Sequence, residues 1–400
     1  MRLFKHAFLT SALVLASCAA LAAPASADAA ADVPTAPPPI TVLSQHAVTP
    51  GTDFFITPTG DTGTYANGPE IVDPSGKVVW FHAVPQGQTA GDFQVQTYRG
   101  RPVLTWWQGT GFGGLSSGTD YIYDDHYRQI AAVHAGDGLT TDGHEFLITP
   151  WNTALVLSYK TATADLTSIG GPADQTVVDG VVQEIDITTG RVLWQWDSAD
   201  HVPYAQSEQP LPASASTPWD WFHINAVHFD TNGDLLIDAR DTWTTYEVSP
   251  RTGAILWQLG GKASSFSLKT APGTSLDDAG EIFAWQHDPE ALGGGVYTVF
   301  DDESAGTPEY SVSRVVTVKL DPRTHVATLL SAVDQPEGLV AASQGNAQTT
   351  RAGELVVGWG SLPYFSAYAR SGRPLLNAEF PSGVNTYRAY AFPWPAGTAK

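Results

Sequence analysis

Length, composition and charge narrow the class of protein before any motif is read. The chain has 400 residues, 42% of them hydrophobic, and its 38 glycines, 28 prolines and 11% aromatic residues favour many short strands over long helices. Its 20 basic and 41 acidic residues give a formal charge of −21, which argues against nucleic acid and membrane-surface partners but not against a small anionic substrate.

The N-terminus has the features of an export signal. Arg2 and Lys5 precede an apolar run over 7–15, and Ala25-Ser26-Ala27 is a small-residue cleavage site, so residues 1–27 are predicted to be a signal peptide. We therefore expect a secreted, extracellular protein. Leu15-Ala16-Ser17-Cys18 also fits a lipoprotein box, which leaves a membrane-anchored lipoprotein, lipidated at Cys18, as an alternative.

Three further expectations concern the rest of the chain. Cys18 is the only cysteine, which excludes an intrachain disulfide and a thiol nucleophile. Residues 28–48 are rich in Ala and Pro and are predicted to be a disordered leader, followed by one folded domain over 49–400. No later stretch is apolar enough to span a bilayer.

Two kinds of hairpin repeat along this domain. One kind has a tight turn, often of the Asp-x-x-Gly type, between β-branched and aromatic residues, and recurs six times, at 69–82, 121–134, 181–196, 245–259, 314–330 and 364–380. The second kind lies between successive copies, at 92–107, 144–159, 223–240, 287–300 and 344–359. Its sixth copy is split between 387–394 and 52–58, which predicts an all-β, six-bladed β-propeller closed by N- and C-terminal strands that share one blade.

The propeller topology predicts where a site would lie. The innermost strand comes first in each blade, so the starts of these strands form a ring at one mouth of the central channel. The connections at that mouth are the long ones, at 135–143, 160–179, 197–222 and 260–285, whereas the opposite face has short turns. Long loops on one face of a rigid scaffold commonly carry the function.

Three ring positions in consecutive blades hold histidine: His144, His223 and His287. A single histidine at a strand start is more often structural, but three at equivalent positions favour function. Hairpin register places Asn225 opposite roughly Arg240, and brings Asp301 opposite His287 as the residue that would orient it. His228 has the opposite strand parity to His223, which favours core packing or solvent.

Aromatic residues form two groups. Trp80, Trp194 and Trp257 recur at one position of the outer hairpin and are interpreted as packing between blades. The long loops on the histidine face carry others, of which Trp221, Phe222, Trp243 and Trp285 are candidates for lining an aromatic substrate pocket. Loop anchoring is the equally weighted alternative for this second group.

Three segments resemble the signature blocks of the arylsulfate sulfotransferase family, in its actinobacterial and fungal branch. They are 143-GHEFLITP, 222-FHINAVHFDTNGDLLIDAR and 285-WQHDPEALGGGVYTVFDD. The resemblance covers most of residues 52–394 and implies a six-bladed propeller that moves a sulfuryl group from an aryl sulfate to a phenol by a ping-pong route. It implies His287 as the nucleophile that becomes sulfated, His144, His223 and Arg240 as the anion clamp, and Asn225 as a supporting donor.

The chemistry of these side chains suits that role without a cofactor or a metal. Imidazoles and a guanidinium can stabilise the negative charge that develops on the sulfuryl oxygens and the leaving phenolate. Neutral imidazole is a capable nucleophile near pH 7. Three alternatives stay open: a quinone-dependent propeller, a propeller in which the histidines and nearby carboxylates hold a divalent metal, and a non-catalytic secreted ligand-binding propeller.

Overall fold

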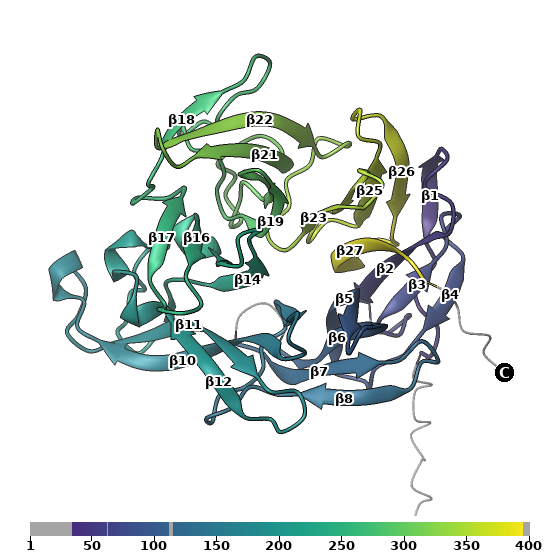
Figure 1. Cartoon of the computed structure of the whole chain (residues 1–400), viewed down its shortest axis with the longest axis horizontal. Coiled ribbons are helices and arrows are strands. Elements are labelled where there is room, and N and C mark those ends of the chain that lie inside the picture. The colour runs from purple at the N-terminus through teal and green to yellow at the C-terminus, as the bar shows by residue number, and fades with distance from the viewer. Residues whose placement is uncertain (1–33, 62, 112–114, 395–400) are drawn as a thin grey trace, which may run out of the picture. The chain divides into compact units, whose positions relative to one another are not determined.

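The computed structural model describes residues 34–61, 63–111 and 115–394. Six small sheets are arranged in a ring, and this part of the chain is a six-bladed β-propeller (Figure 1). Helix is limited to four short 3-10 turns in the described ranges, at Thr167–Ile169, Ser198–Asp200, Tyr204–Gln206 and Arg240–Thr242. The predicted fold class is confirmed. None of the described helices is long and apolar enough to cross a membrane.

Each blade has four antiparallel strands, numbered along the chain and ordered from the axis outwards. Blade 1 has β5 (Thr89–Tyr98), β6 (Arg101–Thr110), β7 (Ser117–Tyr123) and β8 (Gln129–Val133). Blade 2 has β9 (Phe146–Ile148), β10 (Ala154–Ala164), β11 (Gln175–Ile185) and β12 (Val192–Asp197). Blade 3 has β14 (Ile224–Phe229), β15 (Leu235–Ala239), β16 (Thr244–Val248) and β17 (Ile255–Leu259).

The remaining three blades follow the same plan. Blade 4 has β19 (His287–Gly293), β20 (Val296–Asp301), β21 (Arg314–Asp321) and β22 (Val326–Asp334). Blade 5 has β23 (Asn346–Thr349), β24 (Leu355–Gly358), β25 (Tyr364–Tyr368) and β26 (Pro374–Glu379). Blade 6 has β27 (Asn385–Pro393), β2 (Thr52–Thr59), β3 (Glu70–Val72) and β4 (Val78–Phe81), so β27 and β2 close the ring by pairing from the two ends of the chain.

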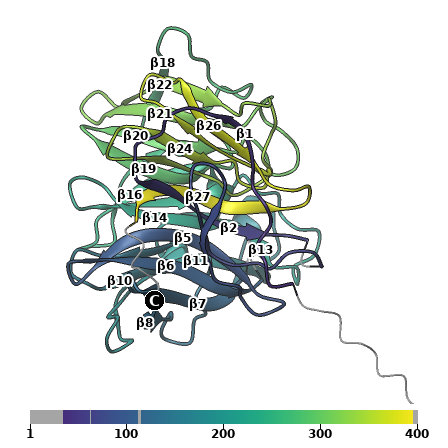
Figure 2. The same cartoon turned by 90° about the vertical axis from the view of Figure 1, so that its right-hand side faces the viewer.

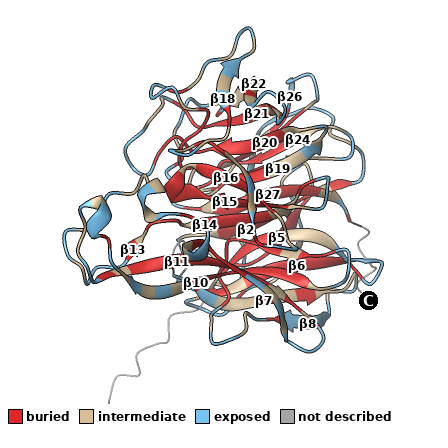
Figure 3. Ribbon diagram, turned by 60° about the vertical axis from the view of Figure 1, so that its left-hand side comes forward, coloured by how far each residue is buried: buried red, intermediate tan, exposed pale blue. Residues whose placement is uncertain are grey.

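Burial follows from the position of a strand within its blade. Strands near the axis are covered by the neighbouring blades and are largely buried, whereas outer strands such as β8 are largely exposed (Figure 3). The outer tryptophans join blades as predicted: Trp257 packs edge-on against Tyr297 of the next blade, and Trp80 stacks on Tyr127. Trp196 adds a hydrogen bond from its indole N–H to the carbonyl of Gly253 in blade 3.

Three short strands extend the four-strand plan. β13 (Trp219–Asp220) pairs parallel to β11, and β18 (Ser267–Thr270) pairs parallel to β22. β1 (Thr41–Gln45) adds to the outer edge of β26, where Figure 2 shows it beside that strand. The expectation that 28–48 is disordered is therefore wrong for 41–45. The predicted signal peptide and Cys18 lie outside the described residues.

The segment 34–49, called the strap below, is held to blade 5 and to blade 6, the blade that closes the ring. Ile40, Val42 and Val48 pack against the apolar cluster between blades 5 and 6. Ala36 accepts a hydrogen bond from the amide of Ala66 in blade 6, and the amide of His46 donates to Leu375 in blade 5. The prediction of disorder was based on the Ala/Pro composition. It failed because a few apolar residues of the strap pack against a surface formed by blades 5 and 6, and because β1 pairs with the outer edge of β26.

We expect the strap to stabilise the closed ring. Replacing Val42, which packs inward, by Ser should lower the free energy of unfolding by about 1 kcal/mol, since part of a valine side chain loses its apolar contact. Thermal unfolding followed by circular dichroism measures this. Leu43→Ser is the matched control, because Leu43 is 46% exposed, and equal effects of the two changes would contradict the assignment.

Candidate functional site

The predicted ring of histidines is present at one mouth of the propeller. His144 lies two residues before β9 of blade 2, His223 lies directly before β14, and His287 is the first residue of β19. The rings of His144 and His223 lie 5.1 Å apart, centroid to centroid, and edge to face. His144 and His287 are buried, whereas the side chain of His223 keeps 13% of its surface exposed. The site is therefore recessed and opens beside His223.

His287 has two different ring nitrogens. Its Nδ1 lies 2.6 Å from a carboxylate oxygen of Asp302, and its Nε2 accepts a longer contact of 3.3 Å from the backbone N–H of Gln344. This arrangement assigns the ring proton to Nδ1 and the lone pair to Nε2. Nε2 is therefore the nucleophilic nitrogen of His287. The backbone N–H of Gln344 forms only a weak hydrogen bond to it.

The orienting carboxylate is Asp302, and the prediction of Asp301 is wrong by one residue. His287 pairs with Phe300 because a bulge follows it in β19. Successive side chains of β20 point to opposite faces of the sheet, so Asp301, next to Phe300, points away from His287. Asp301 instead accepts hydrogen bonds from the guanidinium of Arg314 and the backbone amide of Ala284. Asp288 takes a positive φ of 52° in the bulge, a local backbone choice that strand periodicity cannot show.

Electrostatics keep His287 neutral. Burial lowers its pKa well below the usual histidine value, and the positive charges of Arg240, His144 and His223 lower it further. Burial also raises the pKa of Asp302, which Arg240 opposes. His287 is thus free to act as a nucleophile at neutral pH, and Asp302 is able to take up a proton from it.

The other two histidines are each held by a carboxylate just before them in the chain. Nδ1 of His144 lies 2.5 Å from Asp142, and Nδ1 of His223 lies 2.6 Å from Asp220. Burial alone would lower the pKa of His223, but the carboxylates of Asp220 and Asp241 raise it above the usual value. His223 is the more exposed of the two, and its raised pKa favours the protonated form.

Arg240 lies among the histidines, as predicted, but by a different register. Its backbone N–H bonds to the carbonyl of His223, so it is opposite His223 and not Asn225. The guanidinium donates to Asp241 and to two backbone carbonyls and sits 4.9 Å from the ring centre of Trp285. Its Nε is buried and has no hydrogen-bond partner among the described residues.

The structure separates the predicted pocket residues into two groups. Trp221 and Phe222 are wholly buried in the core between blades 2 and 3, where Trp221 donates to Asp179, so they anchor the loop and do not line a pocket. Trp243 and Trp285 meet edge-on, 5.3 Å apart, beside Arg240. Their indole nitrogens are buried without a partner in the described chain, and of the four predicted aromatic residues these two lie next to Arg240.

Asn225 is not at the site surface. It is fully buried, and its amide donates to the carbonyl of Gln286 at 2.7 Å. A bulge between Ile224 and Ala226 rotates Asn225 toward blade 4. Asn225 therefore holds the segment that carries His287, and the prediction that it donates to substrate is wrong in this structure.

Left-handed backbone conformations occur at five non-glycine residues around this mouth. His223, Trp243, Trp285, Asp288 and Gln344 all have positive φ values, between 49° and 72°. Such conformations cost non-glycine residues free energy and persist where surrounding structure enforces them, commonly at functional sites. The five lie in segments that carry or adjoin the histidines and Arg240.

Below the histidines a charged network occupies the axis. Arg388 of β27 is fully buried and lies 2.7 Å from Glu145 and 3.4 Å from both Asp92 and Asp288. His228 joins them, 3.0 Å from Asp288, because the β14 bulge reverses its expected parity. These side chains fill the axis, so access to the histidines is from the mouth.

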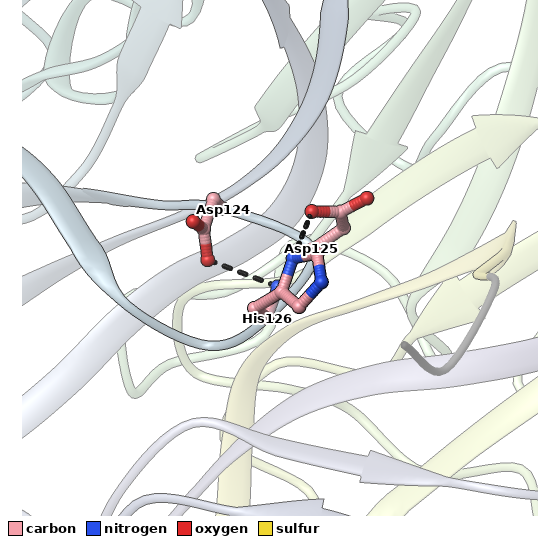
Figure 4. A group of neighbouring side chains, drawn as sticks. All are labelled: Asp124, Asp125 and His126. Atoms are coloured by element: carbon pink, nitrogen blue, oxygen red, sulfur yellow. Dashed lines mark hydrogen bonds and ion pairs between the residues drawn. The ribbon is translucent and has the colours of Figure 1, made fainter. Parts of the chain in front are cut away.

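Three groups of side chains have the composition of metal ligands: Glu145, His228 and Asp288; Asp220, His223 and Asp241; and Asp124, Asp125 and His126. In each of them an arginine already neutralises a carboxylate: Arg388 at Glu145, Arg240 at Asp241 and Arg128 at Asp124. The third group (Figure 4) is a surface turn in which Asp124 accepts from the backbone of His126 and from Arg128. One carboxylate of each group therefore already has a cationic partner.

Asp302, Asp142, Asp220, Gln344 and Arg388 were missed from the sequence. A signal was present for two of them, since Asp142-Gly-His144 and Asp220-Trp-Phe-His223 place a carboxylate shortly before each histidine. Asp302 and Gln344 depend on bulges and on a neighbouring blade, and no local pattern indicates them.

The class of protein follows from these features: a six-bladed propeller with a recessed cluster of imidazoles and one guanidinium at one mouth. The chain belongs to the arylsulfotransferase (ASST) family, whose model matches residues 94–381. No curated protein matches it.

Solved structures show the fold alone. A protein of unknown function from Bacteroides caccae is 12% identical with a TM-score of 0.50, over 85% of this chain and 98% of that chain. A protein of unknown function from Dyadobacter fermentans is 10% identical with a TM-score of 0.44, over 84% and 88%. A putative 6-phosphogluconolactonase from Bacteroides uniformis is 11% identical with a TM-score of 0.43, over 85% and 99%. The last two carry no argument about function.

Proposed function

We propose that this protein transfers a sulfuryl group from an aryl sulfate to a phenol through a sulfated His287. The observation that carries the proposal is the neutral, buried His287, held at Nδ1 by Asp302 and surrounded by Arg240, His144 and His223. Family membership supports aryl substrates, and the paired indoles of Trp243 and Trp285 supply an apolar wall for an aromatic ring.

In the first half-reaction Nε2 of His287 attacks sulfur. The N–S bond forms as the bond from sulfur to the aryl oxygen breaks, and the Nδ1 proton passes to Asp302. Protonated His223 gives its proton to the departing phenolate. Arg240 and His144 stabilise the charge that develops on the sulfuryl oxygens.

The second half-reaction reverses these roles. Neutral His223 takes the proton of the acceptor phenol, whose oxygen attacks sulfur while the N–S bond breaks. Asp302 returns the proton to Nδ1, and His287 is restored. Each proton taken up in the first half is released in the second, so no cofactor is needed to balance the cycle.

A burst experiment tests the proposal. Incubation with 4-nitrophenyl sulfate and no acceptor should release about one nitrophenol per site, and the intact protein should gain one sulfuryl group, which peptide mapping locates on His287. The result should be the same after treatment with a chelator. Loss of the burst on chelation would favour a metal at Asp220, His223 and Asp241 instead.

The pH dependence of the burst rate should differ between aryl sulfates with poor and good leaving groups. Because the pKa of His223 is raised and that of His287 is lowered, both stay in their active forms between the two values. Above the pKa of His223, the burst rate should fall for a phenyl sulfate with a poor leaving group and much less for the 4-nitrophenyl ester, which needs no proton. Stopped-flow rates across pH measure this, and parallel profiles for both donors would contradict the role of His223.

We further propose that residues 1–27 direct export, as the sequence pattern indicates. N-terminal sequencing of the mature protein tests this, since cleavage after Ala27 and lipidation at Cys18 leave different termini.

A further inference from the structure

A half-open groove lies between blades 1 and 2 on the face opposite the histidines. The turns that join β5 to β6, β7 to β8 and β11 to β12 surround it, and its volume is about 800 Å³. The apolar part of its lining includes Tyr98, Pro102, Ile130 and Ile187. Its size falls within the range of small-molecule sites, roughly 300–1,000 Å³.

Arginines are concentrated at this groove although the chain as a whole is acidic. Arg99, Arg101 and Arg128 line it, which is three of the 20 basic residues in a chain of formal charge −21. Arg128 is paired with Asp124, and Asp125 is paired with His126 (Figure 4). Arg99 and Arg101 have no carboxylate partner within the ranges that the structure describes, and the three arginines of the groove outnumber its two carboxylates, Asp124 and Asp125, when His126 is neutral.

The position of Arg99 is fixed by the neighbouring blade. Arg99 and Gly100 have φ values of 51° and 74° in the tight turn between β5 and β6. The amide of Arg99 donates to the side chain of Asn152, and its guanidinium donates to Thr188 and lies over the ring of Tyr98. A side chain ordered before binding loses less conformational entropy when a ligand arrives.

We propose that this groove is a second binding site, separate from the histidine site, for an amphipathic anion: a sulfate, sulfonate or carboxylate group on an apolar body. Arg101 and Arg99 bind the anionic group, and Ile130, Pro102 and Ile187 contact the body. Charge complementarity selects the anion, because the rest of this acidic surface repels one. The apolar lining favours an anion that carries an apolar body over a strongly hydrated inorganic one.

Fluorescence titration with 8-anilinonaphthalene-1-sulfonate tests the proposal. The probe carries a sulfonate on an apolar body, and N-phenyl-1-naphthylamine is its neutral counterpart. We expect saturable binding of the sulfonate, with Kd raised about tenfold or more in Arg101→Gln, since a hydrogen bond to a charged group is lost. The neutral probe should bind less tightly and should not respond to this change.

Two control variants make the result decisive. Arg251→Gln removes an exposed arginine from the β16–β17 turn, outside the groove, and should leave Kd unchanged. Arg240→Gln tests whether the probe occupies the histidine site instead. Loss of binding in Arg240→Gln but not in Arg101→Gln, equal affinity for the charged and neutral probes, or no saturable binding would each overturn the proposal. None of these outcomes bears on the sulfated His287, which the burst experiment tests separately.

Discussion

Replacing His287 by Ala should abolish both the burst of phenol and the sulfuryl label. The nucleophilic nitrogen is then gone, and turnover should fall by roughly 10⁴-fold or more, as when other enzymes lose a covalent nucleophile. Because Asp302 would be left buried without its partner, His287→Asn is the second variant: its amide can still donate toward Asp302 but cannot attack sulfur. A label that persists in either folded variant would assign the nucleophile to another residue.

In the proposed mechanism Asp302 acts through His287. A matched pair of variants separates the role of Asp302 from that of Asp301. Asp302→Asn should slow the burst by about 10²-fold, because the charge that accepts the Nδ1 proton is lost. Asp301→Asn should lower thermal stability through Arg314 and leave the burst rate of the folded protein nearly intact. The reverse pattern would restore Asp301 as the orienting residue.

The largest loss of stability should come from Arg388→Leu. Arg388 is surrounded by Asp92, Glu145 and Asp288, all of them buried, and breaking such a network typically costs about 3–5 kcal/mol. Denaturant unfolding at neutral pH measures this loss. Arg373→Leu, on an exposed turn, is the control and should change little.

The effect of Arg388→Leu should also depend on pH. Burial alone would raise the pKa values of Glu145 and Asp288, but Arg388 and His228 lower them. Groups with lowered pKa values stabilise the folded protein above their unfolded values, and this contribution is lost as pH falls through the folded values. The difference between wild type and Arg388→Leu should therefore shrink under acid. A constant difference would show that Arg388 acts through packing.

Periodicity and repetition in the sequence determined the propeller and the mouth at which the three histidines lie. Six outer hairpins, five inner hairpins and two complementary end strands leave few other closed arrangements, because every edge strand needs a partner. The same repeat phase placed His144, His223 and His287 at equivalent strand starts. The predictions of the propeller and of the histidine positions tolerate an error of one residue in strand pairing, since they depend only on the order of strands within a blade.

The tertiary structure decided which side chains meet. Bulges at Asn225 and Asp288 each shift the alternation by one residue, which exchanges Asp301 for Asp302, turns Asn225 into the core and brings His228 to the axis. The strap likewise becomes ordered because blades 5 and 6 offer it a surface. A one-residue shift reverses the face of every later side chain in a strand, and the energy that selects it comes from contacts with other blades, which the local sequence does not contain.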